Sequence, residues 1–248
     1  MFGYAVLMGD IRVTGADGKT FDGVRKVAGI SNSIAGGFAG NIYQGLSILE
    51  HLTAMTKLPD QQAWKSEFLI ENLPTEMRRV FEGTKEKAGG ENARVEIMLV
   101  GVDPVKNVPQ DTPWPLPYCY IFRSPYFSPE KVEIGKVDSI GSGSSIDAYV
   151  EELENLSNPR QAGQLMQLEV GNPGGFGQVL SHIIGGVAGR QTATDVSPHL
   201  ITCVIKRNDM TQYDNNRSQA TIANNWEELL QLAGEQGFSS DEAKAFIA

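Results

Sequence analysis

The chain has 248 residues, of which 41% are hydrophobic, and it carries a formal net charge of −9. A chain of this length can bury one sizeable core, so we expect a single domain spanning residues 1–248. The acidic balance argues against a nucleic-acid-binding protein, because binding to phosphates draws its affinity from clustered lysine and arginine.

The cysteines and the apolar runs bear on the cellular compartment. Cys119 and Cys203 lie in apolar, strand-like runs without metal-site spacing, which is typical of free thiols in a reducing compartment. The apolar run at residues 1–8 is too short for a signal peptide, and no stretch approaches the length of a membrane span. We therefore expect a soluble, cytoplasmic protein with no membrane partner.

The first part of the chain predicts strands followed by two helices. The strands are expected at residues 4–14 and, broken near Asn32, within residues 24–40, with a Gly- and Asp-rich turn at residues 15–23 between them. Apolar residues at helical spacing predict a helix at residues 41–55, and a second helix is expected around residues 74–89.

The remainder of the chain repeats this order. Strands are expected at residues 93–103, 117–124, 136–144 and 199–207, and helices at residues 145–156, 175–189 and in two pieces within 224–248. Strands, two helices, strands, two helices and a strand suggest two sheets enclosed between helical layers, an α+β protein with a four-layer αββα sandwich.

Five positions near the start of the chain carry a resemblance to a known family. Asp10, Arg12 and Thr14 lie in the segment "MGDIRVTG", Gly40 lies in "AGGFAGN", and Lys26 stands between these two segments. They resemble the first third of a proteasome β-type subunit and of the related bacterial peptidase subunit, both N-terminal-nucleophile hydrolases. In that family a Gly/Ala-Asp-x-Arg-x-Thr strand, a lysine and a glycine before the first helix occur at fixed separations. Residues 1–55 match by motif, and the rest of the chain matches by the order of its elements.

The resemblance implies roles for individual residues. Lys26, held positive by Asp10, would lower the proton affinity of an N-terminal threonine whose own α-amine takes the hydroxyl proton. Gly40 would donate its backbone N–H to the oxyanion, and Thr14 would pair with an extended peptide substrate. Ser142, in "GSGS", would be a hydrogen-bonding neighbour of the amine.

Several of these residues also have a plainer interpretation. Taken alone, Asp10 and Lys26 would more often be two unrelated surface charges, and Ser142 would more often be a turn or helix N-cap serine. Phe38 would lie at the base of an apolar, shallow specificity pocket that favours small uncharged residues, or it is simply a core aromatic residue; both can be true.

Metal and cofactor chemistry is not expected. His182 and His199 lie on apolar segments without a second ligand at metal spacing, so we interpret them as satisfied core or interface histidines. The segment "GNPGGFGQ" lacks the Lys-Ser/Thr ending of a phosphate-binding loop and is interpreted as a turn entering a helix.

In the family frame the nucleophile belongs seven residues before Met1, so the first strand of the family lacks its N-terminal residues here. The first functional hypothesis is a proteasome-like peptidase subunit of a self-compartmentalising ring protease, complete only when residues precede Met1. The alternative is a non-catalytic structural or regulatory ring subunit. The retained Asp10 and Lys26 favour the peptidase, since a subunit without a nucleophile has no chemical need for a buried ion pair.

The same resemblance implies partners. We expect a homo-oligomer of stacked rings of six or seven protomers that acts on peptides or unfolded proteins, with an ATPase as a candidate regulator. The apolar and glycine-rich helix expected at residues 178–189 is difficult to explain on a free surface, which favours burial between subunits.

Overall fold

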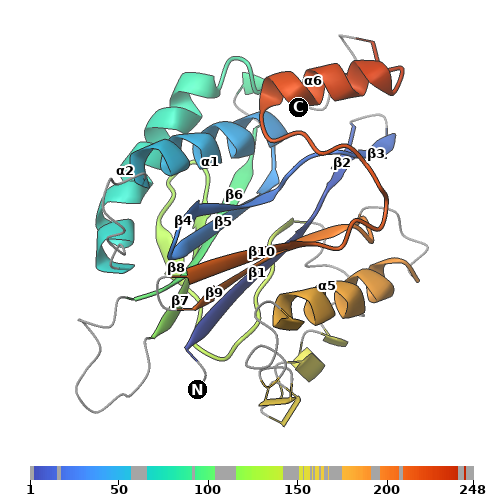
Figure 1. Ribbon diagram of the computed structural model, residues 1–248. Coiled ribbons are helices and arrows are strands. Elements are labelled where there is room, and N and C mark those ends of the chain that lie inside the picture. Colours follow the sequence, from blue (N-terminus) through green and yellow to red (C-terminus); the bar gives the residue numbers. More distant parts are fainter. Residues whose placement is uncertain are drawn as a thin grey trace.

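The computed structural model describes residues 3–15, 18–56, 66–90, 93–103, 116–141, 151–152, 154–156, 158, 160–161, 163–164, 167, 175–190, 196–206, 209–239 and 243. Within these ranges the chain is a mixed α+β protein with antiparallel sheets of five, three and two strands (Figure 1). The α+β class predicted from the sequence is confirmed.

The largest sheet has its five strands in chain order. They are β4 (Val27–Ser31), β5 (Ile34–Gly40), β6 (Val95–Val102), β7 (Pro117–Arg123) and β8 (Pro129–Lys131). The central strands β5 and β6 are apolar on both faces, because alternate side chains enter two different hydrophobic clusters.

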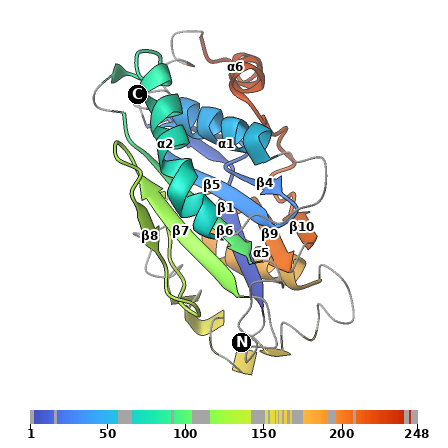
Figure 2. The same ribbon diagram turned by 90° about the vertical axis from the view of Figure 1, so that its left-hand side faces the viewer.

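Two helices, α1 (Ile42–Thr56) and α2 (Ser66–Thr84), cover one face of this sheet (Figure 2). The side chain of Asn41 caps α1, because its Oδ1 accepts the N–H of Gln44 at 3.0 Å. Helix α2 begins at Ser66, whose N–H and hydroxyl donate to Asp103 at 2.8 and 2.9 Å. The cap therefore ties the start of α2 to the segment that follows β6.

The second sheet consists of β1 (Tyr4–Asp10), β9 (Leu200–Lys206) and β10 (Asp209–Asp214), with β9 in the middle. Helix α5 (Gly175–Ala188) covers its outer face (Figure 1). A Cβ on Gly177 would lie 2.6 Å from the Tyr213 ring and 2.9 Å from Val204, so glycine allows the helix to approach the sheet. The apolar face of α5 is thus buried within the chain and does not need a second subunit to explain it.

The inner faces of the two sheets pack against each other through a cluster of small and branched side chains. Leu7, Val27, Ala35, Met98 and Cys203 belong to this cluster. At the edge of the cluster a Cβ on Gly9 would lie 2.5 Å from Cγ2 of Val27, so the end of β1 lies very close to the start of β4. This approach positions the site described below.

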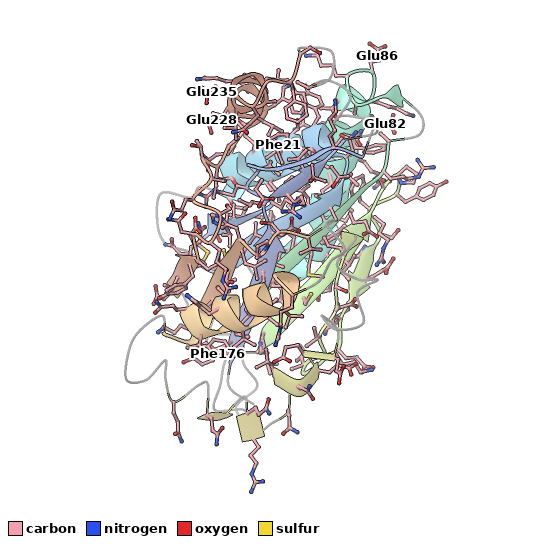
Figure 3. All side chains as sticks on the ribbon, turned by 90° about the vertical axis from the view of Figure 1, so that its right-hand side faces the viewer. Phe21, Glu82, Glu86, Phe176, Glu228 and Glu235 are labelled. Atoms are coloured by element: carbon pink, nitrogen blue, oxygen red, sulfur yellow. The ribbon has the colours of Figure 1, made fainter. Side chains whose placement is uncertain are left out.

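A hairpin and a helix close the end of the molecule beyond β1. The hairpin is formed by β2 (Arg12–Thr14) and β3 (Thr20–Asp22), and the helix is α6 (Trp226–Glu235). The ring centroids of Phe21 and Phe238 lie 5.3 Å apart, which joins the hairpin to the segment after α6. Phe21 lies at the end of the molecule that carries α6 (Figure 3).

Most predicted elements are confirmed, and four expectations are wrong. The expected strand over residues 4–14 is interrupted at Ile11, and the expected turn after it contains β3. Helix α2 begins at Ser66, ahead of the expected start, and accommodates Pro74 inside it. Residues 136–141 contain no strand, whereas the expected helix at residues 175–189 is present as α5. Among the helices within the described ranges, none has the length and apolar character needed to cross a bilayer.

Candidate active site

The ends of β1 and β4 bring together the two charges that the sequence singled out. Nζ of Lys26 lies 3.0 Å from Oδ1 and 3.3 Å from Oδ2 of Asp10, so the ammonium group contacts both carboxylate oxygens. The side chains are 18% and 16% exposed, respectively. The expected contact is therefore present, although both side chains keep some exposure to solvent where full burial was expected.

Asp10 is held by the backbone as well as by lysine. Its Oδ1 accepts the N–H of Arg12 at 2.7 Å, across the break between β1 and β2. The carboxylate therefore has two donors on one oxygen, which fixes its rotamer and satisfies its charge.

A second acidic group, which the sequence reasoning missed, continues the network from Arg12. The guanidinium of Arg12 donates to Asp22 from Nε at 2.8 Å and from Nη2 at 3.4 Å. Asp22 also accepts the hydroxyl proton of Ser197 at 2.5 Å, and Nη1 of Arg12 donates to the carbonyl of Val196 at 3.4 Å. The segment before β9 is thereby fastened to the hairpin beside the Asp10–Lys26 pair.

Gly40 ends β5 in a conformation that only glycine adopts easily. Its φ is +87°, and a Cβ there would lie 2.4 Å from the carbonyl oxygen of Arg94. Both the backbone conformation and the close approach therefore require glycine.

The N–H of Gly40 faces the side of β5 on which Lys26 lies. Val95, which lies opposite Gly40 on β6, hydrogen-bonds to Ser124 instead. Its N–H donates to Oγ of Ser124 and its carbonyl accepts the N–H of Ser124, each at 3.0 Å, so neither group is directed to Gly40. Two residues earlier, the N–H of Phe38 donates to the carbonyl of Lys26 at 3.1 Å. Since N–H groups two residues apart in a strand point the same way, the N–H of Gly40 is directed past the end of β4, where Lys26 lies.

Thr14 and Phe38 occupy quite different surroundings. Thr14 is exposed at the end of β2 and pairs with Thr20 across the hairpin. Phe38 is only 4% exposed and lies under α1, where a Cβ on Gly45 would touch its ring at 2.1 Å. Its cluster also contains Val13, Val24 and Ile42, so Phe38 is a core residue, and its role beneath a specificity pocket stays a prediction.

Ser142 lies outside the described residues, but its neighbour Gly141 is described. The N–H of Gly141 donates to Glu96 at 3.1 Å, and a Cβ on it would lie 2.6 Å from that of Ala39, next to Gly40. Glu96 is in turn held by Arg123 at 2.7 Å, and hydrogen bonds from Arg123 to Glu130 and Glu96 raise the pKa of its guanidinium. This network fixes Gly141 against the end of β5.

The two histidines have different environments. His199 is fully buried and hydrogen-bonded, which confirms the expectation of a satisfied core histidine. His182 lies on the exposed side of α5, where its Nδ1 contacts the carbonyl of Gln178 at 2.8 Å, so it is not a core residue. Over the described part of the chain, no group of three or more histidine, cysteine or acidic residues is arranged to hold a metal ion.

The chain matches no protein-family model, and none of the curated proteins matches it.

Proposed function

We propose that this chain is a proteasome-like peptidase subunit with the four-layer αββα sandwich of the N-terminal-nucleophile hydrolases. The observation that carries the proposal is the contact between Lys26 and Asp10 at 3.0 Å, beside β5 on the side that the N–H of Gly40 faces. A cation and a backbone N–H donor on one side of a strand are groups that an acyl-transfer site uses. Two sheets with helices on their outer faces support the proposed sandwich.

In the proposed mechanism, a hydroxyl on a residue upstream of Met1 attacks the carbonyl carbon of the scissile peptide bond. The α-amine of that residue takes the hydroxyl proton and later delivers it to the leaving amine. Lys26, kept positive by Asp10, favours the deprotonated forms of both groups near it. Gly40 donates to the oxyanion, and water then hydrolyses the ester.

The proposal is tested on the full reading frame. An in-frame threonine, serine or cysteine is expected seven codons upstream of the Met1 codon, and the chain that matures at this residue is expected to cleave fluorogenic peptides. Lys26→Met in that chain is expected to lower kcat/KM by at least about 100-fold, because the lysine acts on the nucleophile.

Two results would contradict this proposal. If the Lys26→Met chain keeps its peptidase activity, the lysine has no part in the mechanism. A reading frame without a nucleophilic residue at that position, in a protein that still forms rings, would favour the non-catalytic ring subunit.

A further inference from the structure

A serine, a histidine and an aspartate meet on the segments that flank β9 and β10. His199 directly precedes β9, Asp214 ends β10, and Ser218 follows in the next turn. Nδ1 of His199 lies 2.5 Å from Oγ of Ser218, and its Nε2 is hydrogen-bonded to Oδ1 of Asp214. The imidazole is fully buried, whereas Ser218 is exposed and Asp214 is 38% exposed.

The partners of the imidazole assign its protons. In the neutral imidazole the nitrogen that faces Asp214 carries the proton and donates it, because a carboxylate can only accept. The other nitrogen, Nδ1, then has a lone pair, and the hydroxyl of Ser218 donates to it. Asp214 thus holds the imidazole as the tautomer that can take a proton from Ser218, which is the logic of a serine nucleophile with a positioned base.

The turn that carries Ser218 is held rigidly. The side chain of Asn215 donates to the carbonyls of Ser181 and Pro198 at 3.1 and 3.0 Å, and its Oδ1 accepts the N–H of Leu200 at 3.0 Å. Arg217 donates to two carbonyls of α5 at 3.2 Å each. The serine is therefore presented to the base by a turn that is fixed on both β9 and α5.

We propose that Ser218 is an activated acyl-acceptor serine, with His199 as its base and Asp214 as the positioning residue. The site would react with activated carboxylic esters and related electrophiles. Oγ of Ser218 bonds to the carbonyl carbon, its proton passes to Nδ1 of His199, and the bond to the leaving group breaks. The leaving alkoxide or phenolate departs with that proton. This inference is independent of the proposed peptidase site.

The surroundings of Ser218 favour capture of the acyl group over repeated turnover. Three N–H groups of the turn are already used: that of Asn216 donates to Asp214 at 2.7 Å, that of Gln219 to the carbonyl of Asn216 at 3.3 Å, and that of Ala220 to Oγ of Ser218 at 3.3 Å. A tetrahedral oxyanion would therefore find no uncommitted donor among them. We expect one acyl group per chain and slow hydrolysis of the ester.

The experiment treats the folded chain with a fluorophosphonate probe. The Oγ–P bond forms, the P–F bond breaks, and fluoride leaves with the proton from His199. Peptide mapping is expected to locate the label on Ser218, at a rate at least about 100-fold above that at Ser128, an exposed serine in the same molecule. Ser218→Ala is expected to abolish the label, whereas Ser128→Ala is expected to leave it unchanged.

Asp214→Asn tests the positioning role, because an amide can donate to Nε2 and so favours the wrong tautomer. It is expected to slow labelling of Ser218 by at least about 100-fold, with thermal unfolding as the check that the chain is folded. If Ser218 in the unmodified chain is labelled no faster than Ser128, the proposal is overturned. An unchanged rate in a folded Asp214→Asn chain would overturn it as well.

Discussion

At the residue scale, the main feature is a charge pair that the fold assembles from two strand ends. Asp10 is satisfied by Lys26 and by the N–H of Arg12, and Lys26 also supplies the carbonyl that accepts from Phe38. A charge taken out of water in this way is costly once its partner is removed, since desolvation is then no longer offset. The pair is therefore a sensitive point for stability as well as for the proposed chemistry.

Lys26→Met tests this coupling. The change leaves Asp10 without its countercharge, and we expect a loss of about 1–3 kcal/mol in the free energy of unfolding, below the 3–5 kcal/mol typical of fully buried pairs. Adding Asp10→Asn is expected to recover part of the loss, and urea unfolding of the four chains measures it. Lys131→Met, at an exposed lysine on β8, is the control and is expected to change little. Additive effects at Lys26 and Asp10 would contradict the coupling.

The two cysteines give a second residue-scale prediction. Burial raises the pKa of the thiols of Cys119 and Cys203 to about 12, because the thiolate loses its hydration. At pH 8 the thiolate fraction falls roughly a thousand-fold, and alkylation of the native protein by iodoacetamide is expected to slow accordingly. Mass spectrometry is expected to show no adduct in the native protein and two after unfolding in guanidinium. A rapid adduct on native Cys119 would contradict this.

At the element scale, one glycine, Gly9, sets how closely the two sheets approach each other. Gly9 at the end of β1 faces Val27 at the start of β4, the strand that Lys26 precedes. Valine is branched at Cβ and adjusts its rotamer poorly, so the space for a further methyl group is missing. The same contact that packs the sheets therefore also sets the reach of Lys26 to Asp10.

Gly9→Ala is expected to destabilise the protein by about 1–3 kcal/mol, because the new methyl group overpacks the contact with Val27. Val27→Ala in the same chain is expected to restore part of the stability, which urea unfolding measures. Gly234→Ala on α6 is the matched control. A Cβ there meets nothing within 4 Å, and alanine favours helices, so a gain of up to about 1 kcal/mol is expected. An unchanged free energy of unfolding in Gly9→Ala would contradict this prediction, because it would mean that the two sheets move apart at this contact without cost.

The elements that could be predicted from the sequence are those with a strong local pattern. Helix α1, the buried strands β6, β7 and β9, and helix α5 all show apolar runs or helical spacing. The short strands β8 and β10 were missed, because they are largely exposed and polar and so carry no alternating signal. For α2, the expected range of residues 74–89 misses the first turns, because the helix begins at Ser66 and continues through Pro74.

The residues of the candidate sites likewise divide into those that could be predicted from the sequence and those that could not. The contact between Asp10 and Lys26 is predicted by the five-position resemblance, because the two residues taken alone would more often be unrelated surface charges. Asp22 and Ser197 could not be placed together, since their contact depends on how the segment before β9 meets the β2–β3 hairpin. His199 was recognised as a core residue, but Ser218 and Asp214 lie in a turn and at a strand end that the sequence pattern did not locate.

At the scale of the whole molecule, the question is how copies of the chain assemble. The buried face of α5 is explained within the chain, so the ring prediction now depends on the proposed family alone. We predict rings of six or seven protomers, stacked in pairs. Light scattering at micromolar concentration measures the mass. A strictly monomeric mass would contradict the ring and, with it, a self-compartmentalising protease.

The pairing of β1 with β9 also determines when the molecule can be completed. Tyr4 pairs with Lys206 and Asp10 with Leu200, so β1 depends on a strand that the ribosome makes much later. At ordinary translation speeds β1 waits roughly 10–40 s for its partner. During that interval a nascent chain has neither the second sheet nor the hydrogen bond from Ser197 to Asp22. Synthesis itself thus delays the site, and a ribosome-bound chain stalled before β9 holds its Lys26 and Asp10 in an unfinished scaffold.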